Sequence, residues 1–359
     1  MSRTFRTSAF ALSLFLSACS SGTTSQGTSS GGTNGTTSGT STPSPVSTLA
    51  SFIQEESCTA PPTSVAVSPD GQIFTVAGML LQITPDGGSI EILPFHQGIV
   101  AVTASSANVF ISEGKPIALY TEASYNQTYL AGGSSGCSNG IDGIDGGVGF
   151  SIGTALAADA QDNLYLADWS STLSGCTRIR KVDSEGNTST VAGSGAAGFM
   201  DGPASIAQFD EPSGIAVDIS THNLYVSDSF NNRIRMVDPT GMTTTIAGNG
   251  VAGFDDGSGT PNTPGSATFN LPTGIAVASS GNLYVADTNN NAIRMITPDG
   301  VTTTVAGNGI AGDFNGTLGQ TGTTEFNFPI GVAVDSKGNI YVADQGNCSI
   351  RMITPSGAP

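Results

Sequence analysis

The sequence predicts an all-β fold, a β-propeller of six four-stranded blades whose ring is closed by an N-terminal strand. Three observations support this prediction: a four-strand pattern that recurs along the chain, 48 glycines with abundant Thr, Asn and Asp that suit tight turns, and no stretch with a sustained helical apolar period. With 359 residues and 38% hydrophobic content, the chain is long enough to bury a sizeable core.

The recurring pattern is clearest in the second half of the chain, where three copies align. Each copy opens with Pro-x-Gly-Ile/Val-Ala-Val, continues with Asn-Leu/Ile-Tyr-Val-Ala/Ser-Asp, and then reads Ile-Arg-Met. The first runs are 212–218, 272–278 and 329–335; the second are 223–228, 282–287 and 339–344; the third are 234–237, 293–296 and 350–353. Fourth runs, Thr-Thr-Thr-Ile/Val-Ala-Gly, follow at 243–248 and 302–307. Four β-branched runs between turn residues predict one antiparallel sheet per copy, with strands a, b, c and d in chain order.

Three earlier copies bring the expected number of blades to six. A clear copy runs from 155 to 193, and two degenerate copies occupy 64–93 and 99–132. The last copy stops after strand c, and residues 46–51 match 302–307 in pattern. We therefore expect residues 46–51 to supply the missing strand d and close the ring, which protects edges that an open sheet would expose. A β-solenoid or a β-sandwich is the alternative arrangement.

The repeated pattern resembles the NHL repeat, and this resemblance implies a six-bladed propeller. It is strong over residues 150–355 and weak over 46–149. Connectors such as 247–250 followed by 254–257 resemble those of teneurin-like and bacterial extracellular NHL proteins. Scaffolds of this kind serve unrelated functions, so the resemblance predicts the architecture rather than the ligand.

The first 19 residues have the features of a lipoprotein signal peptide. Arg3 and Arg6 precede an apolar stretch, and Leu-Ser-Ala-Cys at 16–19 resembles the bacterial lipobox at every position. The resemblance implies lipidation of Cys19 after cleavage; an ordinary secretory signal cleaved near the same position is the alternative. Ser20 is not the Asp that usually retains such lipoproteins at the inner membrane. We therefore expect a lipid-anchored protein of the cell envelope, at the outer membrane.

Residues 20–45 consist almost wholly of Ser, Thr, Gly, Asn and Pro, a composition that cannot bury enough apolar surface to offset the entropy of ordering. We expect a disordered tether, whose reach of about 5–6 Å times the square root of its length would hold the domain roughly 25–30 Å from the membrane. The expected division is a signal peptide at 1–19, a tether at 20–45 and the propeller at 46–359.

The balance of charge limits the class of partner. Acidic residues outnumber basic ones 28 to 11, which gives a formal net charge of −17. Such a chain repels phosphate backbones, so no nucleic-acid partner is expected. An unknown protein or glycan at the cell envelope, neutral or cationic, fits the charge better, and the expected membrane contact is the lipid anchor.

The cysteines divide according to the expected fold. Cys19 is assigned to the lipid, and the other four belong to an oxidising compartment. Because strands alternate in direction, the b–c turns and the connectors from d to the next a share one face of the ring. Cys176 and Cys348 fall in b–c turns, and Cys58 and Cys137 fall in connectors. Neighbourhood then predicts the disulfide bonds Cys58–Cys348 and Cys137–Cys176; no cysteine pair has the close spacing of zinc ligands.

An acid recurs at the end of strand b, and it makes up most of the candidate binding residues. These acids are Glu113, Asp168, Asp228, Asp287 and Asp344. Four of them have an arginine in strand c, and these are Arg180, Arg235, Arg294 and Arg351. We expect charge pairing across the b–c hairpin. The alternative is a ring of carboxylates that binds a cation or a cationic ligand.

Asp-Gly pairs recur in the connectors, at 142–143, 201–202 and 256–257, with Asn315-Gly316 in the same place. The run 142–147 is rich in the hard oxygens that calcium prefers, but its spacing fits no EF-hand loop. We expect turn chemistry here, with a bound calcium ion as the alternative. No other cofactor is predicted.

The sequence contains no convergent catalytic set. His96 and His222 fall on opposite faces of the expected ring, and nothing resembles a nucleophile elbow. We therefore expect a non-catalytic, envelope-anchored binding or scaffold protein that recognises a protein or carbohydrate ligand with one propeller face. Trp169, the one tryptophan, either stacks on such a ligand or caps the core between blades. The alternative function, on fold analogy alone, is a divalent-metal-dependent, lactonase-like hydrolase with carboxylates at the central opening.

Overall fold

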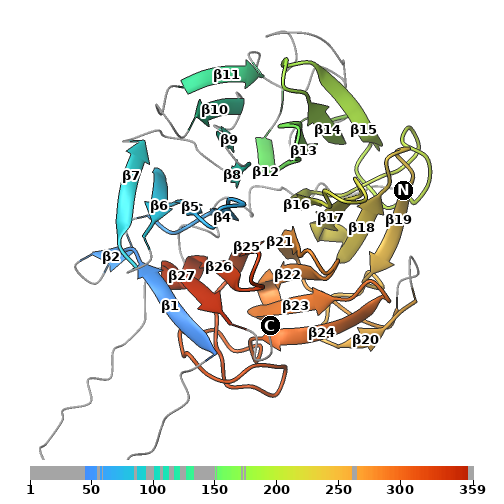
Figure 1. Ribbon diagram of the computed structural model, residues 1–359. Coiled ribbons are helices and arrows are strands. Elements are labelled where there is room, and N and C mark those ends of the chain that lie inside the picture. Colours follow the sequence, from blue (N-terminus) through green and yellow to red (C-terminus); the bar gives the residue numbers. More distant parts are fainter. Residues whose placement is uncertain are drawn as a thin grey trace, which may run out of the picture.

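A computed structural model describes residues 45–54, 57–58, 60–84, 87–93, 101–105, 108–112, 117–121, 127–132, 150, 152–170, 173, 175–260 and 265–354. These residues form sheets arranged as blades around a central axis (Figure 1). Cys19, Glu113, Cys137 and His96 lie outside the described residues, as do the expected signal peptide and nearly all of the expected tether.

The six blades follow the chain in order. Blade 1 contains β4 (Ser64–Val67), β5 (Ile73–Val76), β6 (Leu80–Ile83) and β7 (Ser89–Leu93). Blade 2 contains β8 (Ala101–Ala104), β9 (Asn108–Ser112), β10 (Ile117–Thr121) and β11 (Gln127–Ala131). Blade 3 contains β12 (Ile152–Ala158), β13 (Leu164–Trp169), β14 (Thr177–Val182) and β15 (Thr188–Gly195). Blade 4 contains β16 (Pro212–Val217), β17 (Leu224–Asp228), β18 (Arg233–Val237) and β19 (Thr243–Ala247).

Blades 5 and 6 complete the ring. Blade 5 contains β21 (Pro272–Val277), β22 (Leu283–Asp287), β23 (Ala292–Ile296) and β24 (Val301–Ala306), with the two-residue β20 (Gly257–Ser258) added beside β24. Blade 6 contains β25 (Pro329–Val334), β26 (Ile340–Asp344), β27 (Ser349–Ile353) and β1 (Val46–Ser51). Short 3-10 helices occupy the b–c turns of blades 4, 5 and 6, at Ser229–Asn231, Thr288–Asn290 and Gln345–Asn347. The prediction of a six-bladed β-propeller is confirmed.

The first strand of each blade lies next to the axis and the last strand lies at the rim (Figure 1). The repeated Pro-x-Gly of strand a is explained by this crowding at the axis. A Cβ atom on Gly274 would lie only 2.6 Å from the carbonyl oxygen of Ile330 in the next blade. Glycine at this position therefore allows neighbouring first strands to approach closely.

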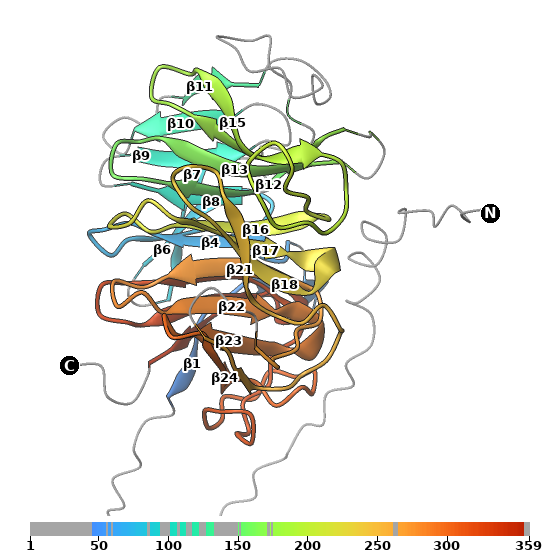
Figure 2. The ribbon, with the colours of Figure 1, turned by 90° about the vertical axis from the view of Figure 1, so that its right-hand side faces the viewer.

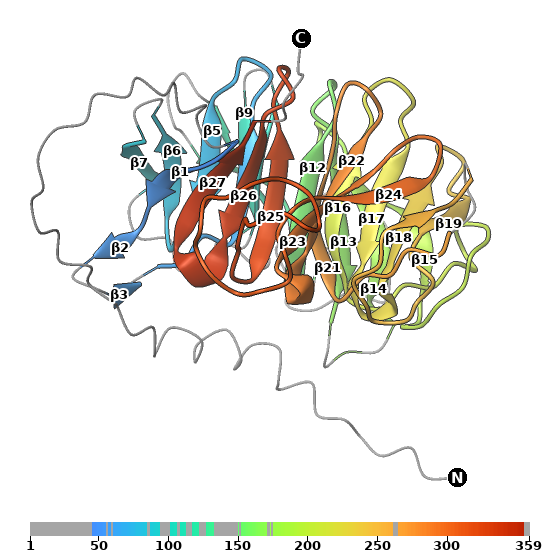
Figure 3. The same cartoon turned by 90° about the horizontal axis from the view of Figure 1, so that it is seen from below.

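The ring closes as the sequence predicts. β1 pairs antiparallel with β27, from Val46 opposite Ile353 to Ser51 opposite Ser349. Val46 is fully buried, and it packs in the cluster of apolar side chains between blades 5 and 6. The chain then continues into a small hairpin of β2 (Ile53–Gln54) and β3 (Ser57–Cys58), which lies at one face of the ring when the ring is seen edge-on (Figure 3).

The core of the described chain is divided among the blade junctions. One cluster of buried apolar side chains lies at each junction, built from Val, Ile, Leu, Ala and aromatic residues of the two facing sheets. Since each blade is buried on both sides, burial of apolar surface holds the blades together. The turns are left at the two faces of the ring, which Figure 2 shows edge-on.

Candidate functional site

The recurrent acids of strand b form buried ion pairs with the arginines of strand c. Asp228 Oδ2 lies 2.5 Å from Arg235 Nη1, and neither side chain is exposed. The equivalent distances are 2.7 Å for Asp287–Arg294, 2.8 Å for Asp344–Arg351 and 3.8 Å for Asp168–Arg180. These contacts bear out the expected pairing across the b–c hairpin.

Asp228, Asp287 and Asp344 also fix the loops around them. Asp228 Oδ1 accepts the backbone N–H of Asp210, at 2.7 Å, just before strand a. Asn231 in the b–c turn donates both to Asp228 Oδ2 and to the carbonyl oxygen of Gly198 in the connector. Asn290 in blade 5 and Asn347 in blade 6 donate the same two hydrogen bonds. The ion pairs thus tie each b–c turn to the connector beside it.

The Asp-Gly pairs of the connectors have a role that sequence reasoning missed. Asp201 accepts Arg235 Nη2 at 2.6 Å and the Thr245 backbone N–H at 3.1 Å. Asp256 accepts Arg294 Nη2 at 3.0 Å, and Asn315 Oδ1 accepts Arg351 Nη2 at 2.5 Å. Each arginine therefore bridges an acid in its own hairpin and an oxygen in a connector. Asp201, Asp256 and Asn315 occupy the same position in the connectors that follow strand d. This repeated position was the sequence signal that could have revealed their contact with the arginines.

A phenylalanine three residues before each strand-a proline completes the arrangement. Phe209, Phe269 and Phe326 are fully buried. Their ring centroids lie 5.0, 5.1 and 5.2 Å from the guanidinium carbons of Arg235, Arg294 and Arg351. Cation–π attraction adds to the ion pairs in this dry environment. These phenylalanines could have been found from the repeated Phe-x-x-Pro spacing.

Burial dominates the acid–base behaviour of these aspartates. It raises the pKa values of Asp228, Asp287 and Asp344 to about 6, while the guanidinium groups and the amide donors oppose the rise. A carboxylate that is enclosed and paired in this way is not available to a ligand from solution.

The candidate binding residues therefore differ in their exposure to solvent. Asp168, Asp228, Asp287 and Asp344 are at most 1% exposed, which favours the pairing alternative over a surface ring of carboxylates. Trp169 is the last residue of β13, opposite Ile152, and is partly buried. A direct contact of any of these residues with a ligand stays a prediction.

The cysteines at the ring closure are joined. Cys58 in β3 is bonded to Cys348 in the b–c turn of blade 6, with 5.9 Å between their Cα atoms. This confirms the first predicted disulfide bond. Cys176 is also disulfide-bonded. Because Cys137 lies outside the described residues, the second pairing stays a prediction.

The central channel is narrow along the part that the structure describes, and the side chains around it are nearly all aliphatic. Its volume is about 190 Å³, and its walls are the first strands of all six blades, with Val, Ala, Ile and Leu side chains and Thr103. No carboxylate belongs to these described walls. Within the described residues, no three His, Cys, Asp or Glu side chains are grouped so that they could hold a metal ion. The calcium alternative at 142–147 lies outside this part of the chain and stays untested.

The face that bears the b–c turns and the d-to-a connectors is called here the connector face. Several of its large apolar side chains are exposed to solvent: Phe199, Phe230, Val251, Ile310 and Phe314. Exposed acids stand among them, including Asp255 and Asp313. Scattered apolar residues are common on protein surfaces, but a gathering on one set of loops indicates an interaction surface.

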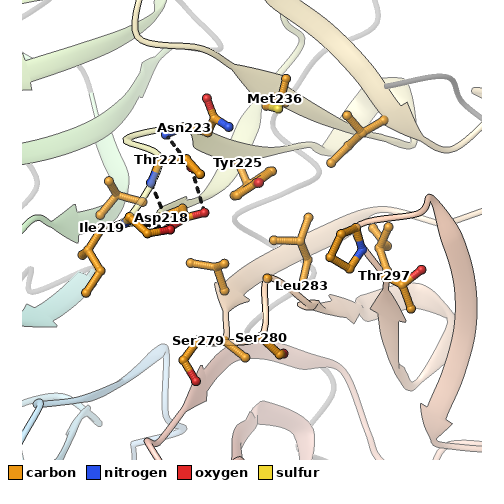
Figure 4. Close-up of a pocket in the computed structure, with 18 of the residues that line it drawn as sticks. Asp218, Ile219, Thr221, Asn223, Tyr225, Met236, Ser279, Ser280, Leu283 and Thr297 are labelled. Atoms are coloured by element: carbon orange, nitrogen blue, oxygen red, sulfur yellow. Dashed lines mark hydrogen bonds between the residues drawn. The ribbon is translucent and has the colours of Figure 1, made fainter. Parts of the chain in front are cut away.

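The opposite face bears the a–b and c–d turns, and it is called here the turn face. A cleft of about 760 Å³ opens in it between blades 4 and 5. Tyr225, Met236 and Leu283 are among its lining residues, and Figure 4 shows Tyr225 and Leu283 on opposite sides of it. Asp218 and Ser280 lie in the turns at its rim.

Comparison with known proteins agrees with this architecture. The sequence profile of the NHL repeat matches residues 209–235, 269–294 and 326–351. Each match begins at the buried phenylalanine and ends at the arginine of the ion pair. The chain is an NHL-repeat β-propeller. Its three matched repeats contain the last three residues of each connector, strands a and b, and the first part of strand c of blades 4, 5 and 6.

The NHL propeller resembles parts of longer proteins. It is 41% identical over 101 residues to NHL repeat-containing protein 2 of Bos taurus, a match that covers 28% of this chain and 13% of that protein. It is 25% identical over 340 residues to Teneurin-1 of Homo sapiens, covering 83% of this chain and 12% of that protein. The chain thus spans about one eighth of the length of these relatives.

Among solved structures, the NHL propeller superposes on an auxiliary nutrient binding protein from Bacteroides thetaiotaomicron. The TM-score is 0.61 at 14% sequence identity, over 86% of this chain and 75% of that chain. At this identity the likeness establishes a shared fold. In the described part of the NHL propeller, no helix is both long and apolar enough to cross a membrane.

Proposed function

We propose that this NHL propeller is a non-catalytic recognition protein, displayed at the cell envelope, that binds a protein partner through its connector face. The observation that carries the proposal is the set of exposed apolar side chains on that face, Phe199, Phe230, Val251, Ile310 and Phe314. Aromatic side chains of this kind dominate the energetic centre of protein interfaces.

The loops that present these side chains are held rigidly. Phe199 follows Gly198, whose carbonyl oxygen accepts Asn231, and Phe314 contributes a carbonyl oxygen to Arg351. Arg233 stacks on Phe199, with its guanidinium carbon 3.8 Å from the ring centroid. Loops fixed in this way lose little conformational entropy on binding, which favours affinity.

The charge of the face supports a partner of complementary character. Asp255 and Asp313 are exposed on the connectors, and the whole chain carries a formal charge of −17. A partner with basic residues around an apolar centre would be attracted before contact. The fold shared with an auxiliary nutrient binding protein is compatible with a binding role.

Display at the envelope is the second part of the proposal. It rests on the lipobox-like run at 16–19 and the Ser/Thr/Gly-rich segment at 20–45, which would place a lipid on Cys19 and let the propeller stand off the outer membrane. Mass spectrometry of the protein from membranes would detect an acylated N-terminal Cys19. An unmodified chain in the soluble fraction would refute the anchor.

The binding role is tested by affinity capture from envelope extract. The full chain is compared with a Phe230→Ser/Phe314→Ser variant and with Met242→Ser, a control for an exposed apolar residue on the turn face that lies outside the cleft. We expect the double variant to lose a captured protein that the wild type and the control retain. Equal capture by all three proteins would overturn the assignment of the connector face.

A further inference from the structure

The cleft between blades 4 and 5 results from a change in a repeated turn. In blade 3, Asp159 Oδ2 accepts the Asn163 amide at 2.8 Å and the Tyr165 hydroxyl at 3.2 Å. The a–b turn of blade 6 repeats this set with Asp335, Asn339 and Tyr341, at 2.8 and 3.1 Å. In these two turns the tyrosine hydroxyl is occupied by the carboxylate of its own blade.

The a–b turn of blade 4 has one more residue between the aspartate and the asparagine. Asp218 and Asn223 are five positions apart, whereas Asp159 and Asn163 are four positions apart. The carboxylate of Asp218 accepts the hydroxyls of Ser220 and Thr221, at 2.6 and 2.8 Å. Among the described residues, no hydrogen bond joins the Tyr225 hydroxyl to Asp218. The longer turn therefore releases this tyrosine from its usual partner.

The facing turn of blade 5 is also changed. Ala278 stands where blades 3 and 6 have Asp159 and Asp335, and its side chain packs against the apolar cluster between blades 5 and 6. Ala278, Ser279 and Ser280 line the cleft from this side. The cleft between this turn and the longer turn of blade 4 has a volume of about 760 Å³.

The cleft combines an apolar inner wall with a polar rim. Its inner wall is apolar, with Met236, Leu283 and Ile296, and Tyr225 presents both an aromatic ring and a hydroxyl. Burial raises the pKa of Tyr225, the charge of Asp218 adds to the rise, and a hydrogen bond with the Asn223 side chain opposes it. The hydroxyl is protonated at neutral pH and can donate. The rim carries the Asp218 carboxylate and the neutral Asn223 amide (Figure 4). The volume falls within the range of about 300–1,000 Å³ that is usual for small-molecule sites.

This combination matches a molecule that has an apolar face and many hydroxyl groups. The C–H face of a pyranose ring packs on apolar and aromatic side chains, and its hydroxyls pair with carboxylate, amide and phenol groups. An anionic ligand is disfavoured, because Asp218 stands at the rim and the chain carries a formal charge of −17. A neutral sugar satisfies both conditions.

We propose that the cleft between blades 4 and 5 binds a neutral saccharide, with the Tyr225 hydroxyl, Asn223 and Asp218 as its polar contacts and Met236 and Leu283 as its apolar floor. The site lies on the turn face, so it is separate from the connector face and from the protein partner proposed there. One chain could bind both a glycan and a protein at the same time.

The test begins with a glycan array probed with the full chain, followed by calorimetric titration of the best neutral oligosaccharide. Tyr225→Phe removes only the hydroxyl, and we expect it to weaken binding about two- to tenfold. Ser280→Trp fills the cleft and should abolish binding. Tyr165→Phe is the matched control, since that hydroxyl is bonded to Asp159, and its affinity for the glycan should equal that of the wild type.

Three results would overturn the proposal: no neutral glycan bound, binding only to charged glycans, or equal binding by the wild type and Ser280→Trp. Melting temperatures of all variants show whether each remains folded. Affinity capture with Tyr225→Phe keeps the two proposals apart, because loss of glycan binding with retained protein capture confines the effect to the cleft.

Discussion

Asp228 and Arg235 meet inside blade 4, with Asp228 Oδ2 2.5 Å from Arg235 Nη1 and both side chains removed from solvent. The pair closes the b–c hairpin, and the other atoms of the arginine reach the connector at Asp201. Blades 5 and 6 contain the same arrangement. Buried ion pairs therefore hold the loops of the connector face in place.

Breaking this pair is expected to be far more costly than changing the outer acid. Asp228→Ala leaves Arg235 buried without its main partner and the Asp210 N–H without its acceptor, which should lower the free energy of unfolding by about 3–5 kcal/mol. Asp201→Asn should cost about 1 kcal/mol or less, because Arg351 in blade 6 already uses the amide oxygen of Asn315 in that place. Urea unfolding measures both changes, and equal losses would contradict this account.

Ring closure by β1 depends on the burial of Val46. Val46→Asp places a carboxylate in the cluster between blades 5 and 6, and we expect it to lower the free energy of unfolding by more than about 3 kcal/mol. Ser51→Asp, at an exposed position on the same strand, should change it by no more than about 0.5 kcal/mol. Chemical denaturation compares the two variants. If Val46→Asp left the free energy of unfolding unchanged, the ring would not need this strand.

The Cys58–Cys348 bond links residues separated by 290 positions, on both sides of the ring closure. Replacing both cysteines by serine should lower the free energy of unfolding by about 2–4 kcal/mol, chiefly because the unfolded chain is no longer constrained. Thermal unfolding before and after a reductant gives the measurement. Peptide mapping without reduction should recover Cys58 linked to Cys348, and free thiols at both positions would rule the bond out.

Glu211 should make stability depend on pH near neutrality. Burial raises its pKa to about 7, and the charge of Asp210 adds to the rise. The folded chain therefore binds this proton more tightly than the unfolded chain. The contribution of Glu211 is fully present below about pH 4.5 and is lost as the pH rises through about 7.

The matching experiment compares wild type with Glu211→Gln by urea unfolding between about pH 5 and pH 8. We expect the stability of the wild type to fall relative to the variant over this range, by about 1 kcal/mol or less, since Glu211 is partly exposed and solvent screens its charge. Glu185→Gln, an exposed acid in a c–d turn, should leave the pH profile of the wild type unchanged. A flat difference between wild type and Glu211→Gln would refute the shift.

The binding residues were harder to predict than the fold. The spacing of Asp228 and Arg235 indicated a pair, but it could not show that the pair is buried beneath the connector. That depends on Phe209 and Asp201, which come from another part of the chain and pack over the arginine. The cleft was missed altogether, since the extra residue before Asn223 matters only when two blades face each other.

By itself, the sequence determined the repeat, the blade number, the closing strand at 46–51 and the Cys58–Cys348 bond. These follow from alternating apolar runs, turn residues and strand direction, which act over short distances and recur regularly. The tertiary structure decided which acids are enclosed and where a cavity opens. Burial and cavity volume arise from side chains that meet across blade junctions, and no local pattern in one strand contains the shape of its neighbour.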